Sequence, residues 1–437
     1  MNFDQLFKKA KEAGIEDLQV TYSAGTELDI EVFKGQIEKY QIADSSGLSV
    51  KGIYKGKMGT VRTEVINEEA FNFVVDSIIQ SANAIDSKDE VFIYEGDDEY
   101  PKVEGLFDQT LNEVPVAKKI EDTKKLEELV MAKDKRMKMA QSYYGQGTTT
   151  VVMENSKGLK LEKKVNSAAF YVQVIATDGE DQRSTFEFAF SNDYNDFDLE
   201  KLATDAVEKS CSLLGAKPCD SGEYEILLTN QASCSLLSPY VSMFSAEAVQ
   251  RGVSLLKDKV GKTISSELIT IVDDPFKAKS PRSGSFDSEG VATQYKEMVK
   301  DGKLTGYLHN LKTAKKADTK STGNASGSGV GPSNFYIIPG EMKYDDAVAS
   351  MKKGLIITAL AGTHSGANPI SGAFSLQASG FLVEDGKIVR PVALITVAGN
   401  YLDMLNDVEG VCDDLDFNFG YIGSPSLKIK KLVVAGK

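Results

Sequence analysis

The strongest constraint on the fold is a pattern that occurs twice in the first half of the chain: a helix, a series of strands and a second helix. Residues 2–13 have apolar side chains at helical spacing and end at Gly14. Short alternating runs then extend from Leu18 to Thr63 and predict a meander of about five strands. They are separated by turn formers: Ala24-Gly25, Lys34-Gly35, Ser45-Ser46-Gly47 and Lys55-Gly56. Asn67 is placed to cap a helix over residues 68–84.

The second occurrence follows a connector, residues 85–115, that is rich in Asp, Glu, Pro and Gly. Helices are predicted near 116–132 and 199–214, with strands between them at 137–144, 148–155, 159–176 and 182–192. Beyond residue 222, β runs dominate, interrupted by helices near 344–352 and 402–408. We therefore predict an α+β fold with an N-terminal region, 1–215, and a β-rich C-terminal domain, 222–437. Residues 1–90 and 115–215 are candidates for two related subdomains within the first region.

Composition narrows the function. The chain has 437 residues, of which 41% are apolar, and its 64 acidic and 50 basic residues give a formal charge of −14. A phosphate backbone would be repelled by such a charge, so we do not expect nucleic acid as the main partner. The sequence lacks a signal-peptide pattern and any run near the roughly 18 apolar residues of a membrane span. The four cysteines, Cys211, Cys219, Cys234 and Cys412, show no metal or disulfide spacing. We expect reduced thiols and a cytoplasmic protein without membrane partners.

A serine-rich helix follows the predicted strand EILLTN. In the segment LLSPYVSMFSAE, residues 236–247, and the alanine that follows it, apolar side chains recur at helical spacing: Leu237, Tyr240, Val241, Phe244 and Ala248. Another face has serines at the same period: Ser235, Ser238, Ser242 and Ser245. Pro239 is expected either to begin the helix, with Ser238 as its cap, or to kink it. The helix therefore has a clear packing face but no base, acid or metal ligand opposite it.

The two histidines offer little for catalysis. His309 and His364 are far apart in sequence and lack the helical pairing of a zinc site such as HExxH. We interpret them as a strand residue and a loop residue. The segment GTHSG at residues 362–366 lacks the GxSxG spacing of a nucleophile elbow, so a tight glycine turn is the better interpretation.

Two further segments are candidates for binding an anion or a cation. The glycine-rich block 321–331 matches no phosphate-binding pattern and is more typical of a flexible loop. Asp287 and Glu289 alternate with small residues, so in an extended stretch both carboxylates would point to one side and could hold a cation or share a proton. Salt bridges and a turn are the structural alternative, and the better supported one.

The order of motifs in the second half resembles the TldD/PmbA family, historically called modulators of DNA gyrase. The resembling segments are FDSEGVATQYKEMVKDGKLTGYLHNLKTAKKA (286–317), STGNA (321–325), NFYIIPG (334–340), GLIITALAG (354–362), VAGNYLDML (397–405) and PSLKIKKLVVAG (425–436). The first 200 residues fit the family layout more loosely. The family motifs include Asp287, Glu289, Gly290, Thr322, Gly323 and Asn324, and the resemblance implies that these residues organise the shared domain or line a peptide cleft, for which His364 is a further candidate.

The resemblance also implies which branch of the family this is. TldD-type subunits have HExxxH on a helix and bind zinc through its two histidines and a downstream cysteine. Alignment on Gly252 places the two histidine positions on Leu237 and Ser242 and the glutamate position on Ser238. All three side chains of the motif are therefore absent. The glycine-rich stretch with the cysteine is replaced by DDLDFNFGYIGSP, and Cys412 is interpreted as a buried small residue. The chain resembles the PmbA/TldE branch, which pairs with TldD-type subunits.

Three functions follow as hypotheses. The first is a non-catalytic subunit, with no cofactor of its own, that pairs with a zinc-bearing TldD-type chain and lines a cleft for an extended peptide. When the partner is absent, a homodimer could use the same surface. The second is an autonomous peptidase with an unrecognised site, for which His364 or Cys412 would be required. The third is a regulatory binding protein of the gyrase-modulator type.

Overall fold

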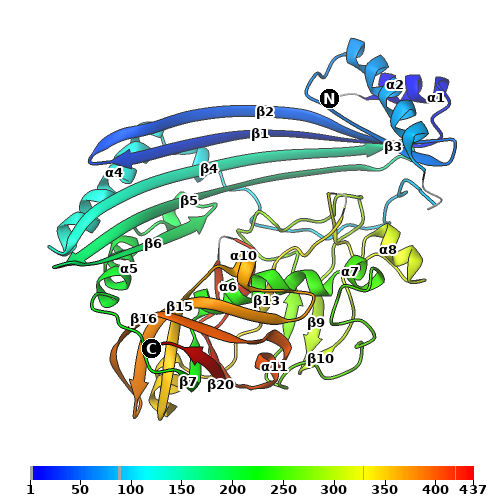
Figure 1. Ribbon diagram of the computed structural model, residues 1–437. Helices are drawn as coiled ribbons and strands as arrows, with labels where there is room; N and C mark the ends of the chain where they lie inside the picture. Colours follow the sequence, from blue (N-terminus) through cyan, green and yellow to red (C-terminus); the bar gives the residue numbers. More distant parts are fainter. Residues whose placement is uncertain (1–2, 87–89, 328, 419) are drawn as a thin grey trace.

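The N-terminal half of the chain forms one long curved sheet in the computed structural model, which describes residues 3–86, 90–327, 329–418 and 420–437. Six antiparallel strands have the order β3-β2-β1-β4-β5-β6 (Figure 1). Their bounds are β1 Leu18–Phe33, β2 Gln36–Tyr54, β3 Lys57–Thr63, β4 Met137–Asn155, β5 Lys160–Asp178 and β6 Asp181–Ser191. Residues 1–90 and 115–215 therefore contribute three strands each to a single sheet, joined where β1 pairs with β4.

The prediction of about five short strands between Leu18 and Thr63 is wrong. Three strands are present, because two of the expected turns lie inside β1 and β2 and face each other: Ala24 pairs with Ser46, and Gly25 with Ser45. Small residues on both strands keep this part of the ladder regular, and a β-carbon on Gly25 would lie 3.0 Å from the Thr148 carbonyl oxygen. The predicted break between residues 144 and 148 is likewise absent from the continuous β4.

Helices cover one face of this sheet. They are α1 Asp4–Glu12, α2 Glu68–Ala84, α3 Thr110–Glu113, α4 Val116–Lys133 and α5 Leu199–Ser212, with the short turn η1 Tyr194–Asp196. The predicted cap is confirmed: Asn67 Oδ1 accepts a hydrogen bond from the Ala70 N–H at 2.9 Å. Even-numbered side chains of β1 enter two cores, Val20 with α1 and α2, and Ile30 with α4 and α5. Because side chains alternate along a strand, the odd-numbered residues of β1 lie on the other face.

The C-terminal half contains two more six-stranded sheets. One has the order β16-β15-β14-β7-β20-β17 and closes on itself because β16 also pairs with β20. Its strands are β7 Gly222–Leu228, β14 Lys353–Ala361, β15 Ala373–Glu384, β16 Lys387–Asn400, β17 Val408–Val411 and β20 Leu427–Ala435. The other has the order β10-β9-β8-β13-β19-β18, with β8 Ile271–Asp273, β9 Lys296–Lys300, β10 Lys303–Leu304, β13 Phe335–Ile337, β18 Asp416–Asn418 and β19 Ile422–Ser424. The predicted α+β fold with a β-rich C-terminal part is confirmed.

Short helices and one pair of short strands complete this half. The helices are α6 Asn230–Tyr240, η2 Val241–Phe244, α7 Ala246–Gln250, α8 Leu311–Lys316, α9 Tyr344–Ser350, α10 Thr363–Gly366 and α11 Tyr401–Asn406. Where a flexible loop was expected, parts of the glycine-rich block pair as antiparallel strands, β11 Ala325–Ser326 and β12 Gly329–Val330, while Ser328 lies outside the described residues. Among the described helices, none is long and apolar enough to cross a membrane.

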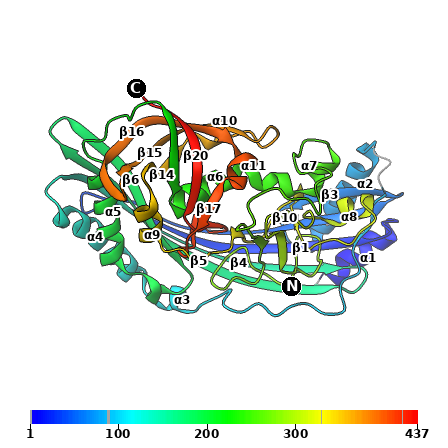
Figure 2. The same cartoon turned by 90° about the horizontal axis from the view of Figure 1, so that it is seen from below.

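The N-terminal sheet arches over the C-terminal half (Figure 1), and Figure 2 shows its strands running across the far side of that half when the molecule is seen from below. The connector fastens the two parts: the Tyr100 hydroxyl donates to the Gly290 carbonyl at 2.7 Å, and Asp97 accepts from the Ala292 N–H at 2.8 Å. Phe286 packs on Met153 and Leu159 of the N-terminal half. The two halves therefore share a contact at the segment that contains Asp287.

Candidate functional site

Helix α6 begins earlier than the sequence suggests. Its cap is Thr229 at the end of β7, and Pro239 lies in its last turn rather than at its start, so neither Ser238 nor Pro239 begins the helix. Because proline has no N–H, Pro239 cannot donate the helical hydrogen bond; the α-helix ends one residue later, at Tyr240, and the chain continues as the tighter turn η2. A separate helix, α7, then begins after Ser245, which caps it. The expected single helix is thus three short ones.

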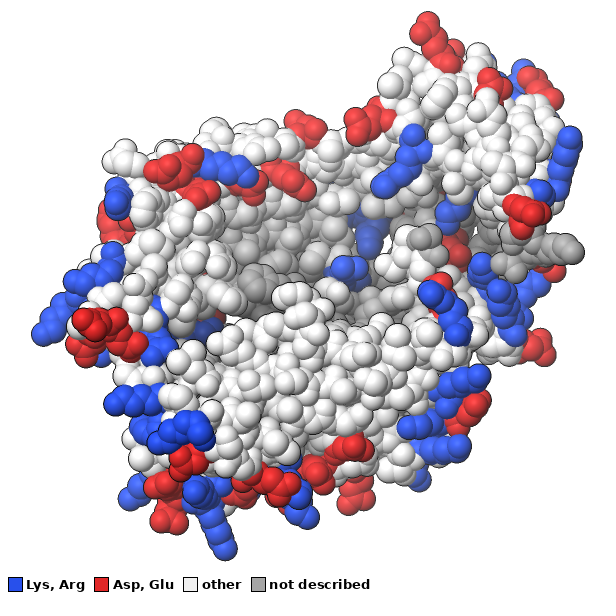
Figure 3. All heavy atoms as spheres, viewed as in Figure 1, with Lys and Arg blue, Asp and Glu red and all other residues white. Residues whose placement is uncertain are grey.

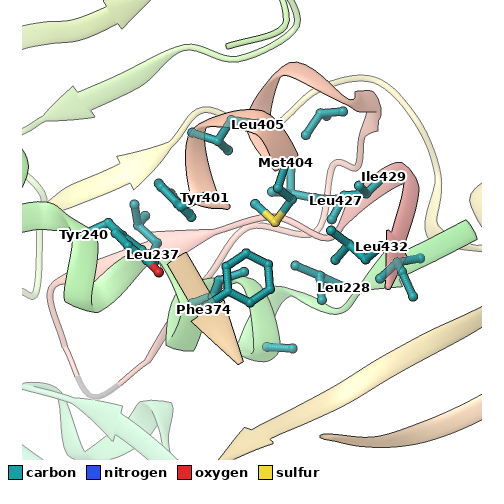
Figure 4. Close-up of a cluster of buried hydrophobic side chains, with 14 of the residues drawn as sticks. Leu228, Leu237, Tyr240, Phe374, Tyr401, Met404, Leu405, Leu427, Ile429 and Leu432 are labelled. Atoms are coloured by element: carbon teal, nitrogen blue, oxygen red, sulfur yellow. The ribbon is translucent and has the colours of Figure 1, made fainter. Parts of the chain in front are cut away.

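The packing face of this segment is confirmed. Leu237 and Tyr240 are almost completely buried in the main C-terminal core (Figure 4). Phe244 is equally buried there, Val241 is also buried, and Ala248 is half-buried. The Tyr240 ring stacks on Tyr401 with centroids 4.2 Å apart and planes at 8°. Its hydroxyl donates to the Ala373 carbonyl at 2.9 Å, so the one polar atom of this buried side chain is satisfied.

The positions aligned with the zinc motif do not form a metal site. Leu237 points into the core, while Ser238 and Ser242 are exposed, and the Ser242 hydroxyl donates to the Pro239 carbonyl at 3.3 Å. A hydrocarbon side chain and two neutral hydroxyls do not match the imidazole, thiolate and carboxylate ligands that zinc prefers. Within the described ranges, no group of three or more His, Cys, Asp or Glu side chains is placed to hold a metal ion. The residues present therefore do not fit a catalytic zinc.

The histidines lie in different surroundings. His309 is buried in a loop just before α8, not in a strand as predicted, and burial lowers its pKa. Its Nδ1 has no hydrogen-bond partner among the described residues. His364 lies exposed on α10, a short helix next to α6, where we expected a loop. The structure thus does not bring the two together.

Asp287 and Glu289 form a turn instead of an extended pair. Asp287 Oδ1 accepts from the N–H groups of Glu289 and Val291, at 2.9 and 3.0 Å, and Oδ2 accepts from the Ala325 N–H at 2.8 Å. Glu289 accepts from the Leu311 N–H at the start of α8. Burial nevertheless raises the pKa of Asp287 to about 6, although the three hydrogen bonds oppose this shift. Each carboxylate therefore organises a different piece of backbone, in agreement with the structural alternative.

The two family-motif glycines are required for close packing. Gly290 has φ of 89°, and a β-carbon there would lie 2.8 Å from Leu159 of the N-terminal half. Gly323 has φ of 68°, and a β-carbon there would lie 2.6 Å from the Ala292 carbonyl oxygen. Both positions combine a left-handed backbone with a near contact, so only glycine fits without rearrangement.

Thr322 and Asn324 belong to a buried polar network that the sequence did not reveal. The Thr322 hydroxyl donates to Asn324 Oδ1 at 2.7 Å, and Asn324 Nδ2 donates to Asp273 at 2.6 Å. Asp273 is fully buried and forms an ion pair with Lys296 at 3.0 Å. Because Asp273 ends β8 and Lys296 begins β9, the network forms only when these strands pair, and no local sequence pattern predicts it.

A hollow lies between the N-terminal sheet and the C-terminal half (Figure 3). Its roof is the open face of the sheet, where Arg62, Thr21, Ser23, Ser49 and Thr149 line a cavity of about 680 Å³. A second cavity, of about 490 Å³, lies next to it, because Thr21 and Ser23 line both. Its floor includes Asp287, Asn324 and the strand β11. The hollow is thus lined by hydroxyls, glycines and a few charged side chains, and three of the predicted motif residues line it: Asp287, Gly323 and Asn324.

Family models match most of the chain. They describe the PmbA/TldA metallopeptidase domain 1 over residues 19–82, the central domain over 109–214 and the C-terminal domain over 221–436. A relative from Escherichia coli O157:H7, metalloprotease PmbA, is 25% identical over 94% of this chain and 91% of its own length.

Solved structures agree over the whole chain. A protein of Thermotoga maritima MSB8 described as a modulator of a DNA gyrase is 32% identical, with a TM-score of 0.93 over 99% of both chains. TldE from Thermococcus kodakarensis shares the fold, with a TM-score of 0.91 and 24% identity over 99% of this chain and 100% of that one. The chain therefore belongs to the PmbA/TldD family of metallopeptidases.

Proposed function

We propose that this chain is the non-catalytic, PmbA/TldE-like subunit of a heteromeric peptidase whose zinc is held by a TldD-type partner. The observation that supports this most directly is the α6 segment: its packing face is intact, but the aligned motif positions are a buried Leu237 and two exposed serines, Ser238 and Ser242. The segment that the resemblance aligns with the zinc motif is therefore well packed but offers no zinc ligand at the aligned positions.

The contribution of this chain is to hold an extended peptide in the hollow. Hydroxyls such as Thr21, Ser23 and Ser49 can donate to or accept from a peptide backbone whatever its side chains, which suits unfolded substrates. The β11–β12 pair, which has no third strand in the described part of the chain, adds a sheet edge at the floor of the second cavity.

The other two hypotheses have less support. For an autonomous cysteine site, Cys412 would need to ionise, but it is buried and burial raises the pKa of its thiol to about 12. The gyrase-modulator description belongs to relatives, and a formal charge of −14 does not favour direct binding to DNA.

Reconstitution tests the proposal. Hydrolysis of an unfolded protein such as reduced casein is measured with this chain alone, with a TldD-type chain from the same organism alone and with both, and zinc in each sample is measured by mass spectrometry. We expect activity and zinc only where the TldD-type chain is present, and the highest activity in the mixture. Stoichiometric zinc in this chain alone, or casein hydrolysis by it that survives purification, would contradict the proposal.

A further inference from the structure

The second cavity contains two cations that come from the two halves of the molecule. Lys163 lies on β5 of the N-terminal sheet, and Arg282 lies in the segment between β8 and β9 of the C-terminal half. The strand register places Ser23, Val151 and Lys163 side by side across β1, β4 and β5, so the lysine shares the open face of the sheet. Figure 3 shows Lys and Arg side chains inside the hollow, between largely uncharged walls.

Lys163 has no counter-ion in the described part of the chain. Its Nζ donates to the Ser283 carbonyl at 3.4 Å, a long contact, and no ion pair with a described carboxylate accompanies it. Burial lowers the pKa of Lys163, and the charge of Arg282 lowers it further. The half-buried Lys163 thus shares the cavity with the exposed Arg282, and the nearness of two like charges costs free energy unless an anion joins them.

Lys296 shows how the same chain treats a structural buried lysine. Its ammonium is 3.0 Å from the Asp273 carboxylate and donates to the carbonyls of Gln294 and Thr322. The contrast indicates that the unpaired state of Lys163 is not a general property of buried lysines in this fold.

The cavity wall accommodates the ammonium. A β-carbon on Gly284 would lie 2.8 Å from Lys163 Cδ and 3.0 Å from Nζ, so the lysine can lie against the backbone only because residue 284 is glycine. Arg282 is fixed on the other side, with its guanidinium carbon 4.4 Å from the centroid of the Tyr421 ring. No carboxylate among the described residues pairs with this guanidinium, so its N–H groups are available to a ligand.

Asp287 lines the same cavity, but no ion pair joins it to Lys163 or Arg282 in the described chain. Its carboxylate accepts hydrogen bonds from three backbone N–H groups instead. Neutral hydroxyls complete the wall: Thr21, Ser23, Ser288, Ser326 and Ser333.

We propose that Lys163 and Arg282 form a carboxylate-binding subsite that holds an acidic group of the peptide in the hollow. The proposal rests on the proposed function, because it needs a peptide in the cavity. Charge-assisted hydrogen bonds to both side chains give the carboxylate a defined position between the two halves. A cavity of about 490 Å³ is large enough for one or two residues, and a carboxylate can come from the carboxyl terminus or from an Asp or Glu side chain.

Fluorescence anisotropy with the full-length chain tests the subsite. Three labelled decapeptides of Gly, Ser and Ala are compared: one with a free carboxyl terminus, one with a terminal amide, and one with a terminal amide and a single internal Asp. The variants are Lys163→Met, Arg282→Gln and Gly284→Ala, which would displace the lysine amine. Lys160→Met is the matched control, since Lys160 lies on the same strand but does not line the cavity. Circular dichroism checks that each variant folds.

We expect at least one carboxylate peptide to bind wild type about tenfold more tightly than the plain amide. Tighter binding of the peptide with the free carboxyl terminus would show that the subsite holds the terminal carboxylate. Tighter binding of the peptide with the internal Asp would show that it holds an acidic side chain. The preference should fall in each of the three cavity variants and persist in Lys160→Met.

Two results would overturn the subsite. If all three peptides bind wild type equally, or if the preference survives in the folded cavity variants, the subsite is wrong although the hollow binds peptide. If no peptide binds wild type, either alone or with its TldD-type partner, the proposed function fails and the subsite falls with it.

Discussion

Tyr240 at the end of α6 and Tyr401 at the start of α11 stack face to face, with ring centroids 4.2 Å apart. This contact joins α6 to the closed sheet of the C-terminal half (Figure 4), because Tyr401 directly follows β16. The end of α6 is thus held by an aromatic contact in the core, while Ser238 on its other side is exposed.

Loss of this stack should destabilise the whole C-terminal half. Tyr401→Ala removes a completely buried ring and should lower the free energy of unfolding by about 3–5 kcal/mol, the usual cost of an aromatic cavity. Tyr240→Phe removes only the hydroxyl that donates to Ala373 and should cost about 1 kcal/mol. Urea unfolding followed by circular dichroism measures both. The control is Ser242→Ala on the exposed face, for which a change within about 0.5 kcal/mol is expected. Equal effects of Tyr401→Ala and Ser242→Ala would contradict the packing described.

Two lysines provide a matched test of buried charge. Lys163→Met should leave stability at neutral pH unchanged or raise it, because it removes a cation with no paired carboxylate in the described chain. Lys296→Met should lower it by about 3–5 kcal/mol, because Asp273 would stay buried without its partner. Thermal unfolding at pH 7 distinguishes the two. A loss of several kcal/mol in Lys163→Met would show that its ammonium has a structural anion.

The same pair predicts a pH dependence. The pKa of Lys163 is lower in the folded chain than in the unfolded chain, so the cost of its charge is present below the folded-state pKa and disappears as pH rises from there towards the ordinary lysine pKa. The difference in stability between Lys163→Met and wild type should therefore shrink as pH rises from neutral towards about 10.4. Urea midpoints across this range measure it, with Lys160→Met as the control. A constant difference would contradict the assigned shift.

The number of strands and the geometry of the site could not be predicted from local sequence patterns, because both depend on contacts between residues that are far apart in the sequence. Helices with clear caps and periods, such as Glu68–Ala84, were predicted to the residue or nearly so. The strands β1 and β2 were predicted too short, because Gly25 and Ser45 are turn formers individually and become ladder partners only when the hairpin forms. The packing face of α6 followed from its period. The closeness of Lys163 and Arg282 could not be predicted in this way, because it depends on how the N-terminal sheet packs on the C-terminal half.

Asp287 predicts a second pH effect, of opposite sign. Its pKa is raised to about 6 in the folded chain, from an ordinary value of 3.8, so the folded state binds the proton more tightly. This contribution to stability is complete below the unfolded value and is lost as pH rises through about 6; it amounts to up to about 3 kcal/mol. Asp287→Asn should remove this loss, so the stability of wild type relative to the variant should fall between pH 4 and pH 6. Asp318→Asn is the control, since Asp318 is exposed and its φ of 49° suits asparagine. A difference independent of pH would contradict the assignment.

Restoring the motif should not restore a metal site. In the triple variant Leu237→His, Ser238→Glu and Ser242→His, the first imidazole would have to enter the core that Leu237 now fills, while the side chain at residue 242 points to solvent. The two histidines would therefore not converge, and no described group of metal ligands supplies the third donor. We expect no stoichiometric zinc by mass spectrometry after dialysis and a loss of about 2–5 kcal/mol in the free energy of unfolding. Ser238→Glu with Ser242→His, which leaves Leu237 in place, is the control and should keep near-normal stability. One equivalent of tightly bound zinc in the triple variant would show that the α6 segment rearranges readily, and that only the ligands separate this subunit from a catalytic one.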